Sequence, residues 1–141
     1  MLLPHILGIV VTVGEIVVPI QSDNNADNAQ DIERVMKTQL AKTTLDSLYV
    51  VEIDYFKDER GFFIEPWHKR DFAATGLNLE FVQEGHSRSA QNVLRGMHYQ
   101  DMTAPMGKLI RCTLGRIFDV AVDLRVSSST FGKWFGIELS A

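Results

Sequence analysis

The sequence has little cysteine and no uninterrupted apolar run long enough to cross a membrane. Its single cysteine, Cys112, excludes an internal disulfide and is typical of a reducing compartment such as the cytoplasm. We interpret Cys112 as a small apolar residue of a strand rather than a nucleophile. Residues 1–20 are apolar, but Pro4, His5 and Glu15 interrupt them and no Lys or Arg precedes them. We therefore expect a packed strand or hairpin there, with neither a membrane span nor a signal peptide.

Basic charge and metal-binding motifs are also scarce. The chain has 14 Lys and Arg against 18 Asp and Glu, a net charge of −4. Proteins that bind nucleic acid usually show a basic face, so nucleic acid is not an expected partner. The four histidines include no His-x-His pair, and eleven residues separate His86 from His98. A metal site needs three or four converging ligands, so we expect no metal.

The composition changes sharply along the N-terminal third of the chain. Residues 21–31 are rich in Asn and Asp and indicate a linker or surface loop. In residues 31–42, apolar side chains recur at helical spacing, which predicts a short helix. We therefore divide the chain into an N-terminal extension, 1–45, and a second unit, 46–141.

The second unit is a succession of short apolar segments separated by turn signals. Residues 68–76 indicate one helical turn closed by Gly76. Many short strands with almost no helix favour a β-sandwich, jelly roll or barrel. The predicted strands are 47–56, 62–67, 79–85, 92–100, 108–114, 116–125 and 132–140.

Alternation in the strand 116–125 defines two faces. Phe118 and Val120 share one face, and Asp119 and Asp123 share the other. Two interpretations of the aspartates stay open. They form a solvated face, which periodicity alone favours, or they line a barrel interior around a ligand.

A few residues are suited to proton transfer beside a carbonyl group. A neutral imidazole at His98 can remove a proton, and an ammonium at Lys108, expected on the neighbouring strand, can stabilise the enolate oxygen that develops. A lone strand histidine is more often structural, so that alternative stays open. Arg95 would share a face with His98 only if a bulge at Gly96 shifts the register. The guanidinium groups of Arg60 and Arg95 suit a diphosphate.

The second unit resembles the dTDP-4-dehydrorhamnose 3,5-epimerase family over residues 46–141. The matching segments are DERGFFIEPW, FVQEGHSRS, NVLRGMHYQ, GKLIRC, IFDVAVDLR and STFGKWFGIELSA. The resemblance implies an all-β cupin-type jelly roll or β-barrel, incomplete here because only the N-terminal half is matched. It also implies a cytoplasmic homodimer without cofactor or metal. Its substrate would be dTDP-4-dehydro-6-deoxy-D-glucose, epimerised at C3 and C5 on the route to dTDP-L-rhamnose for cell-surface polysaccharides.

The same resemblance assigns roles to individual residues. His98 matches the general base that acts at C3 and C5, and Lys108 matches the lysine that stabilises the enolate. Arg60 and Arg95 match arginines of the nucleotide-sugar site. The other matches are Glu65 and Gln83, which hold the substrate, Asp119, which we group with the catalytic residues of the pocket, and Phe62 and Phe63, which pack near the nucleotide.

The sequence departs from the family pattern in two places. Gln83-Glu84-Gly85 stands where the family usually has Gln-x-Asn, so one amide that contacts substrate is missing and a negative charge is added. The sequence ends at Ala141, before the family's half that carries the reprotonating tyrosine and the carboxylate that orients the base. We expect weak or no epimerase activity from this chain alone.

Three alternatives to a 3,5-epimerase remain at this point. A non-catalytic nucleotide-sugar-binding cupin would keep the pocket and lose the chemistry. An epimerase of dTDP-ketodeoxysugars acting at C3 only or C5 only would keep both the pocket and the proton-transfer chemistry. A metal-dependent cupin oxygenase would need a bound metal such as iron.

Overall fold

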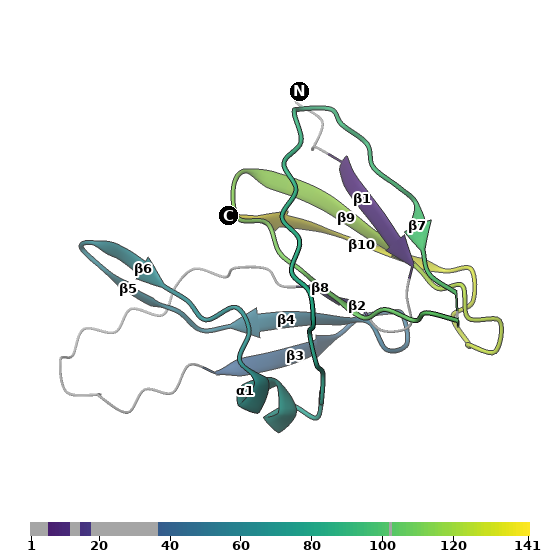
Figure 1. Cartoon of the computed structure of the whole chain (residues 1–141), viewed down its shortest axis with the longest axis horizontal. Helices are drawn as coiled ribbons and strands as arrows, with labels where there is room; N and C mark the ends of the chain where they lie inside the picture. Colours follow the sequence, from purple (N-terminus) through teal and green to yellow (C-terminus); the bar gives the residue numbers. More distant parts are fainter. Residues whose placement is uncertain (1–5, 12–14, 18–36, 102) are drawn as a thin grey trace.

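The regular secondary structure of the described residues is almost entirely β-strand, with one short helix (Figure 1). The computed structural model describes residues 6–11, 15–17, 37–101 and 103–141. No helix in these ranges is long and apolar enough to cross a membrane. The elements are β1 (Ile6–Val11), β2 (Glu15–Val17), β3 (Thr38–Lys42), β4 (Tyr49–Ile53), β5 (Phe56–Asp58), β6 (Gly61–Phe63), α1 (Lys69–Ala74), β7 (His98–Tyr99), β8 (Lys108–Ile110), β9 (Arg116–Val122) and β10 (Trp134–Ser140).

Two four-stranded sheets make up most of the fold. The first has the order β10-β9-β1-β7 and the second has the order β3-β4-β2-β8. The pairs β9–β10 and β3–β4 are antiparallel, whereas β1 and β2 run parallel to both of their neighbours. The antiparallel hairpin of β5 and β6 projects from this body (Figure 1).

The hairpin of β9 and β10 is the longest ladder of the described part. Its pairing runs in register from Trp134↔Val122 to Ser140↔Arg116. Gly136 lies opposite Val120, and a Cβ atom built on Gly136 would come within 2.6 Å of the Phe118 ring. The ring of Phe118 therefore fits against β10 only because residue 136 has no side chain.

The apolar core has two parts, one on each side of the second sheet. Ala121 of β9 and Leu139 of β10 are buried with Cys112, and Ile110 of β8 packs against this cluster. The second cluster contains Val51, Ile53 and Phe72, with Leu109 packed against it. One face of the second sheet is therefore turned to the first sheet, and the other is covered by α1. The expected burial of Cys112 is confirmed.

The predicted all-β class is confirmed, and the structure is a cupin-type fold without a closed barrel in its described part. The helical turn closed by Gly76 is also confirmed, with φ +94° at that glycine. The strand expected within residues 1–20 is present as β1 and β2. These two strands lie in different sheets, so they do not form a hairpin with each other.

Three predictions of secondary structure are wrong in whole or in part. Thr38–Lys42 is strand β3 rather than helix, because Leu40 and its neighbours pair with β4 and this pairing outweighs the helical spacing. The rest of the predicted helix, 31–36, lies outside the described residues. Residues 79–85 are irregular, and no described strand pairs with them; Val82 is 95% exposed. Of the strand expected at 92–100, only β7 forms.

Candidate active site

Asp119 is a buried acid in the middle of β9. Asp119 is 4% exposed. By alternation it shares a face with Ile117 and Ala121, which belong to the core between the sheets. Burial raises the pKa of the Asp119 carboxyl to about 6, although the Val120 amide and the Lys108 ammonium act to lower it. Asp123, on the same face, is also buried. The expectation of a solvated aspartate face is therefore wrong.

Lys108, the first residue of β8, is turned toward the first sheet. Leu109 packs in the cluster under α1, whereas Ile110 packs against the cluster that contains Ala121. Lys108 shares the face of Ile110, because residues two apart in a strand point the same way. Its electrostatic effect on Asp119 agrees with this orientation. The structure thus brings together a half-buried ammonium and a buried carboxyl from opposite sheets.

His98 lies on the same face of the first sheet as Asp119. Ile9 of β1 is opposite Val120, and the next residue, Val10, is opposite His98. One residue along a strand changes the face, so His98 falls on the side opposite to Val120, which is the side of Asp119. The imidazole is exposed. The expectation that His98 and Lys108 occupy neighbouring strands is wrong, since β7 and β8 belong to different sheets.

Arg95 lies in the irregular segment before β7. Its Nε donates a hydrogen bond to Ser89 Oγ at 2.9 Å, and a terminal nitrogen donates to the Arg88 carbonyl oxygen at 3.4 Å. Gly96 has φ +108°, a conformation that favours glycine, but no strand pairing runs through it. The predicted bulge at Gly96 is therefore wrong, because there is no ladder whose register it could shift.

Arg60 forms the tip of the β5–β6 hairpin together with an acidic partner. Its Nε donates to Asp58 Oδ2 at 2.9 Å and its backbone amide donates to Asp58 Oδ1 at 2.8 Å. Hydrogen bonds from Arg60 hold the pKa of the Asp58 carboxyl below its usual range. The Arg60 side chain is 85% exposed, and Phe62 and Phe63 of β6 are exposed beside it. Because the hairpin projects from the body (Figure 1), Arg60 is not brought next to the residues between the sheets.

The remaining residues assigned by the resemblance lie on the surface. Glu65 follows β6 and Gln83 lies in the irregular segment after α1; both are exposed. Glu84 and Gly85, where the sequence departs from the family pattern, are exposed as well. Of the residues assigned to the site, Lys108 and Asp119 are the pair whose interaction is explicit.

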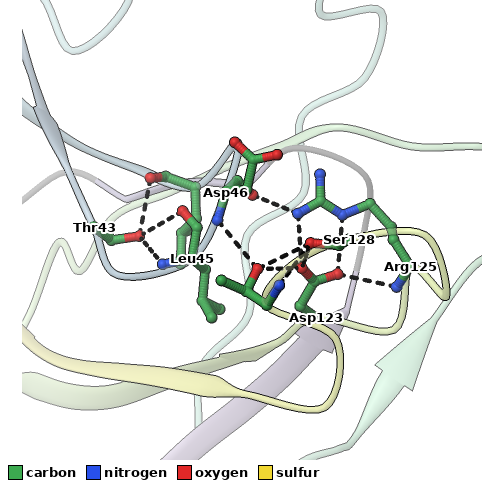
Figure 2. A network of polar contacts seen from close by, with 8 residues as sticks. Thr43, Leu45, Asp46, Asp123, Arg125 and Ser128 are labelled. Atoms are coloured by element: carbon green, nitrogen blue, oxygen red, sulfur yellow. Dashed lines mark hydrogen bonds and ion pairs between the residues drawn. The ribbon is translucent and has the colours of Figure 1, made fainter.

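A buried polar network near the site escaped the sequence analysis (Figure 2). The Asp123 side chain is 2% exposed and accepts hydrogen bonds from Arg125 at 2.8 and 2.9 Å. The hydroxyl groups of Ser128 and Thr130 also donate to Asp123, each at 2.6 Å. Arg125 in turn donates to the Asp46 carbonyl oxygen at 2.6 Å. The network fastens the loop after β9 to the loop between β3 and β4, and its signal was the concentration of Asp, Arg, Ser and Thr in one loop.

Within the described ranges, no group of three or more His, Cys, Asp or Glu side chains could hold a metal ion. The groups on the facing sides of the two sheets are instead the Lys108 ammonium, the Asp119 carboxyl and, by strand alternation, the exposed His98 imidazole. Such a set can remove a proton and stabilise the negative charge that develops on a nearby oxygen.

Comparison with known proteins identifies relatives of the chain. Residues 42–141 match the family described as dTDP-4-dehydrorhamnose 3,5-epimerase. The protein of that name from Shigella flexneri is 52% identical over 101 residues, which are 71% of this chain and 56% of the relative. A dTDP-4-dehydrorhamnose 3-epimerase from Streptomyces niveus is 36% identical over 96 residues, 67% of this chain and 46% of the relative. The chain therefore spans about half the length of the curated relatives that it matches.

Solved structures give the same result. The dTDP-4-dehydrorhamnose 3,5-epimerase of Elizabethkingia anophelis is 48% identical with a TM-score of 0.68, covering 74% of this chain and 57% of the other. The Bacillus anthracis enzyme, solved with TDP and PPi bound, is 38% identical with a TM-score of 0.71, covering 74% and 60%.

Proposed function

The chain belongs to the dTDP-4-dehydrorhamnose 3,5-epimerase family, and on this premise we propose that it supplies the proton-abstracting part of an epimerase. The substrate would be dTDP-4-dehydro-6-deoxy-D-glucose, epimerised at C3 and C5 in dTDP-L-rhamnose biosynthesis. The observation that supports this most directly is the electrostatic interaction of Lys108 with the buried Asp119, with His98 on the Asp119 face of the first sheet by strand alternation.

In the proposed mechanism, His98 is the general base. The C4 ketone makes the protons on C3 and C5 acidic, because the carbanion left behind is delocalised onto the ketone oxygen as an enolate. A neutral imidazole takes each proton, and the Lys108 ammonium stabilises the enolate oxygen. Asp119 would act beside Lys108, whose ammonium interacts electrostatically with the Asp119 carboxyl.

Substrate binding would use the exposed basic and polar residues. Arg60 and Arg95 would contact the diphosphate, with Glu65 and Gln83 holding the remainder of the substrate. The Bacillus anthracis relative was solved with TDP and PPi bound, which supports a nucleotide diphosphate as the ligand class. We further propose a cytoplasmic homodimer that works without cofactor or metal, with neither nucleic acid nor membrane as partner. The exposed rings of Phe62 and Phe63 support a protein contact at the β5–β6 hairpin.

Deuterium exchange tests the proposal at its central step. The substrate is incubated in D₂O with the chain, and loss of the C3 and C5 proton signals is followed by NMR. We expect exchange above the buffer rate, and a fall of at least about 100-fold with His98→Ala, because a general base typically contributes 10²–10⁴-fold. The matched control is His86→Ala, which removes an exposed imidazole from an irregular segment.

The possible outcomes separate the candidate functions. Exchange that His98→Ala leaves unchanged would contradict the proposed base. Binding of dTDP by calorimetry without any exchange would identify a non-catalytic nucleotide-sugar-binding protein. Exchange at C3 alone would identify the 3-epimerase alternative, the activity in the name of the Streptomyces niveus relative.

A further inference from the structure

We infer that β1 (Ile6–Val11) and β2 (Glu15–Val17), which precede the region that matches the family, are a working part of the site, because they hold in place the two strands that carry His98 and Lys108. The family match begins at residue 42. That match assigns no role to β1 and β2. Their pairing with β7 and β8 does assign them one.

β1 is the support of the strand that carries His98. β7 has only two residues and lies at the end of the first sheet, where β1 is its neighbour. The pairs are Val10↔His98 and Val11↔Tyr99. On its other side β1 pairs with β9, the strand of Asp119. In the described part of the chain, His98 is therefore connected to the Asp119 strand through β1.

β2 has the same role in the second sheet. β8 has three residues and ends the sheet beside β2, with the pairs Glu15↔Lys108, Leu109↔Ile16 and Ile110↔Val17. The other neighbour of β2 is β4, which is anchored in the core through Val51 and Ile53. Strands of two or three residues are not stable alone, and each unpaired buried backbone group costs free energy. The positions of β7 and β8 therefore depend on the two N-terminal strands β1 and β2.

This arrangement makes β1 and β2 positioning elements for the proposed reaction, and that consequence rests on the proposed function. If β2 is lost, the Lys108 ammonium is no longer fixed opposite Asp119. If β1 is lost, His98 is no longer held on the face of Asp119. The His98 imidazole and the Lys108 ammonium would still be present, but they would no longer be held in position relative to Asp119.

Engineered disulfides test the pairing without reference to any substrate. In a Cys112→Ala background, two pairs are introduced separately: Val11→Cys with Tyr99→Cys, and Val17→Cys with Ile110→Cys. Residues in register on adjacent strands are about 5 Å apart, within the range a disulfide spans. The matched control combines Val11→Cys with Ile110→Cys, which lie on strands of different sheets. Sheets pack about 10 Å apart, which a disulfide does not span.

We expect both in-register pairs to cross-link within one chain, detected by peptide mapping under non-reducing conditions, and the control pair to stay reduced. Absence of the in-register links would overturn the inference. Links found only between two chains would overturn it too, because a second copy would then supply the strands. Equal linking in the control would show that β1 and β2 have no fixed register, and the inference would fail on that result as well.

A second measurement asks whether β2 positions Lys108. Proline lacks the amide that a central strand donates, so Ile16→Pro should break the pairing of β2. We expect amide hydrogen exchange in β8 to quicken at least about tenfold, protection in β9 and β10 to persist, and C3/C5 exchange to fall. Ile16→Val keeps the backbone amide, so this variant should match the unsubstituted protein in all three measurements. Unchanged β8 protection in Ile16→Pro would refute the positioning role. Failure of the unsubstituted chain to catalyse C3/C5 exchange would count against the proposed function and leave the disulfide result standing.

Discussion

The Lys108 ammonium, on one sheet, acts on the buried Asp119 carboxyl of the other sheet and favours its ionised form. Burial acts in the opposite direction and is stronger, so the pKa of Asp119 is raised to about 6. Near neutral pH Asp119 is therefore ionised, and in mildly acidic solution it becomes neutral. The stability and the chemistry of the site both depend on this balance.

Asp119 should make the protein less stable as the pH rises from about 4 to about 6. An acid whose pKa is higher in the folded protein binds more protons when folded, so the free energy of unfolding falls as it ionises. From a rise in pKa from 3.8 to about 6, Asp119→Asn should become more stable relative to the unsubstituted protein by up to about 3 kcal/mol between pH 4 and pH 7.

Urea unfolding at four pH values across this range measures the difference. The control is Asp101→Asn, which removes an exposed carboxyl whose pKa is lowered by hydrogen bonds from Thr103. Curves for Asp119→Asn and the unsubstituted protein that run parallel from pH 4 to pH 7 would show that Asp119 is not the buried acid described above.

Replacing Lys108 should move the titration of Asp119 upward. Lys108→Met keeps much of the side chain's apolar length and removes the charge that lowers the pKa of Asp119. Carbon-detected NMR titration of the Asp119 carboxyl should then give a midpoint above that of the unsubstituted protein. Lys133→Met removes an exposed ammonium from the loop before β10 and should leave the midpoint unchanged. An unchanged midpoint in Lys108→Met would place Lys108 too far from Asp119 to act on it.

Arg60 should contribute to the affinity for dTDP. A bidentate, charge-assisted contact with a phosphate contributes roughly 1.5–3 kcal/mol, so calorimetry on Arg60→Ala should show at least about a tenfold loss of affinity. Arg70→Ala is the control, since Arg70 is also exposed and also paired with a nearby carboxylate, that of Asp71. Equal affinity in the two variants would remove Arg60 from the binding site.

The Asp123 network should matter for stability rather than for binding. Asp123→Asn removes the buried carboxylate that pairs with the partly buried Arg125 guanidinium, and it should lower the free energy of unfolding by about 3 kcal/mol. Asp58→Asn is matched to it, because Asp58 and Arg60 form the same two-residue spacing on an exposed hairpin. Chemical denaturation should show little change for Asp58→Asn. Comparable stability of both variants would mean that burial adds nothing to the network.

Net epimerisation by the 141-residue chain should be slower than proton exchange. Abstraction needs the base, whereas inversion also needs an acid on the opposite face, and the site proposed above includes no residue for that role. We expect product formation at least about 100-fold below that of the Shigella flexneri relative, followed by NMR under identical conditions. Equal rates would show that another residue of the chain delivers the proton.

Local patterns predicted the elements whose neighbours are close in sequence. The alternation in β4, β9 and β10 and the glycine that closes α1 were sufficient, because hairpins and caps are encoded within a few residues. β3 was mistaken for a helix because its spacing fits both periods and its partner, β4, decided the outcome. The parallel insertion of β1 and β2 depends on pairing with strands about 90 residues away, which no local pattern reveals.

The same distinction applies to the site. His98, Lys108 and Asp119 could be named from residue type and from the family resemblance, but which faces they share depends on the register through β1 and on the packing of β8. Periodicity favoured a solvated position for Asp119, and burial against the second sheet reversed that interpretation. Arg60 could be named as well, yet its place on a projecting hairpin follows from the tertiary arrangement.

Gly136 has a consequence beyond its own packing. Sliding β10 by two residues in either direction would keep its inner and outer faces unchanged, so alternation alone does not forbid the slip. Such a slip would bring Trp134 or Glu138 to the place where the Phe118 ring leaves room for a hydrogen atom only. Either slip would require the Phe118 ring to move aside, so the smallest residue of the ladder disfavours misalignment of the strand that carries Asp119.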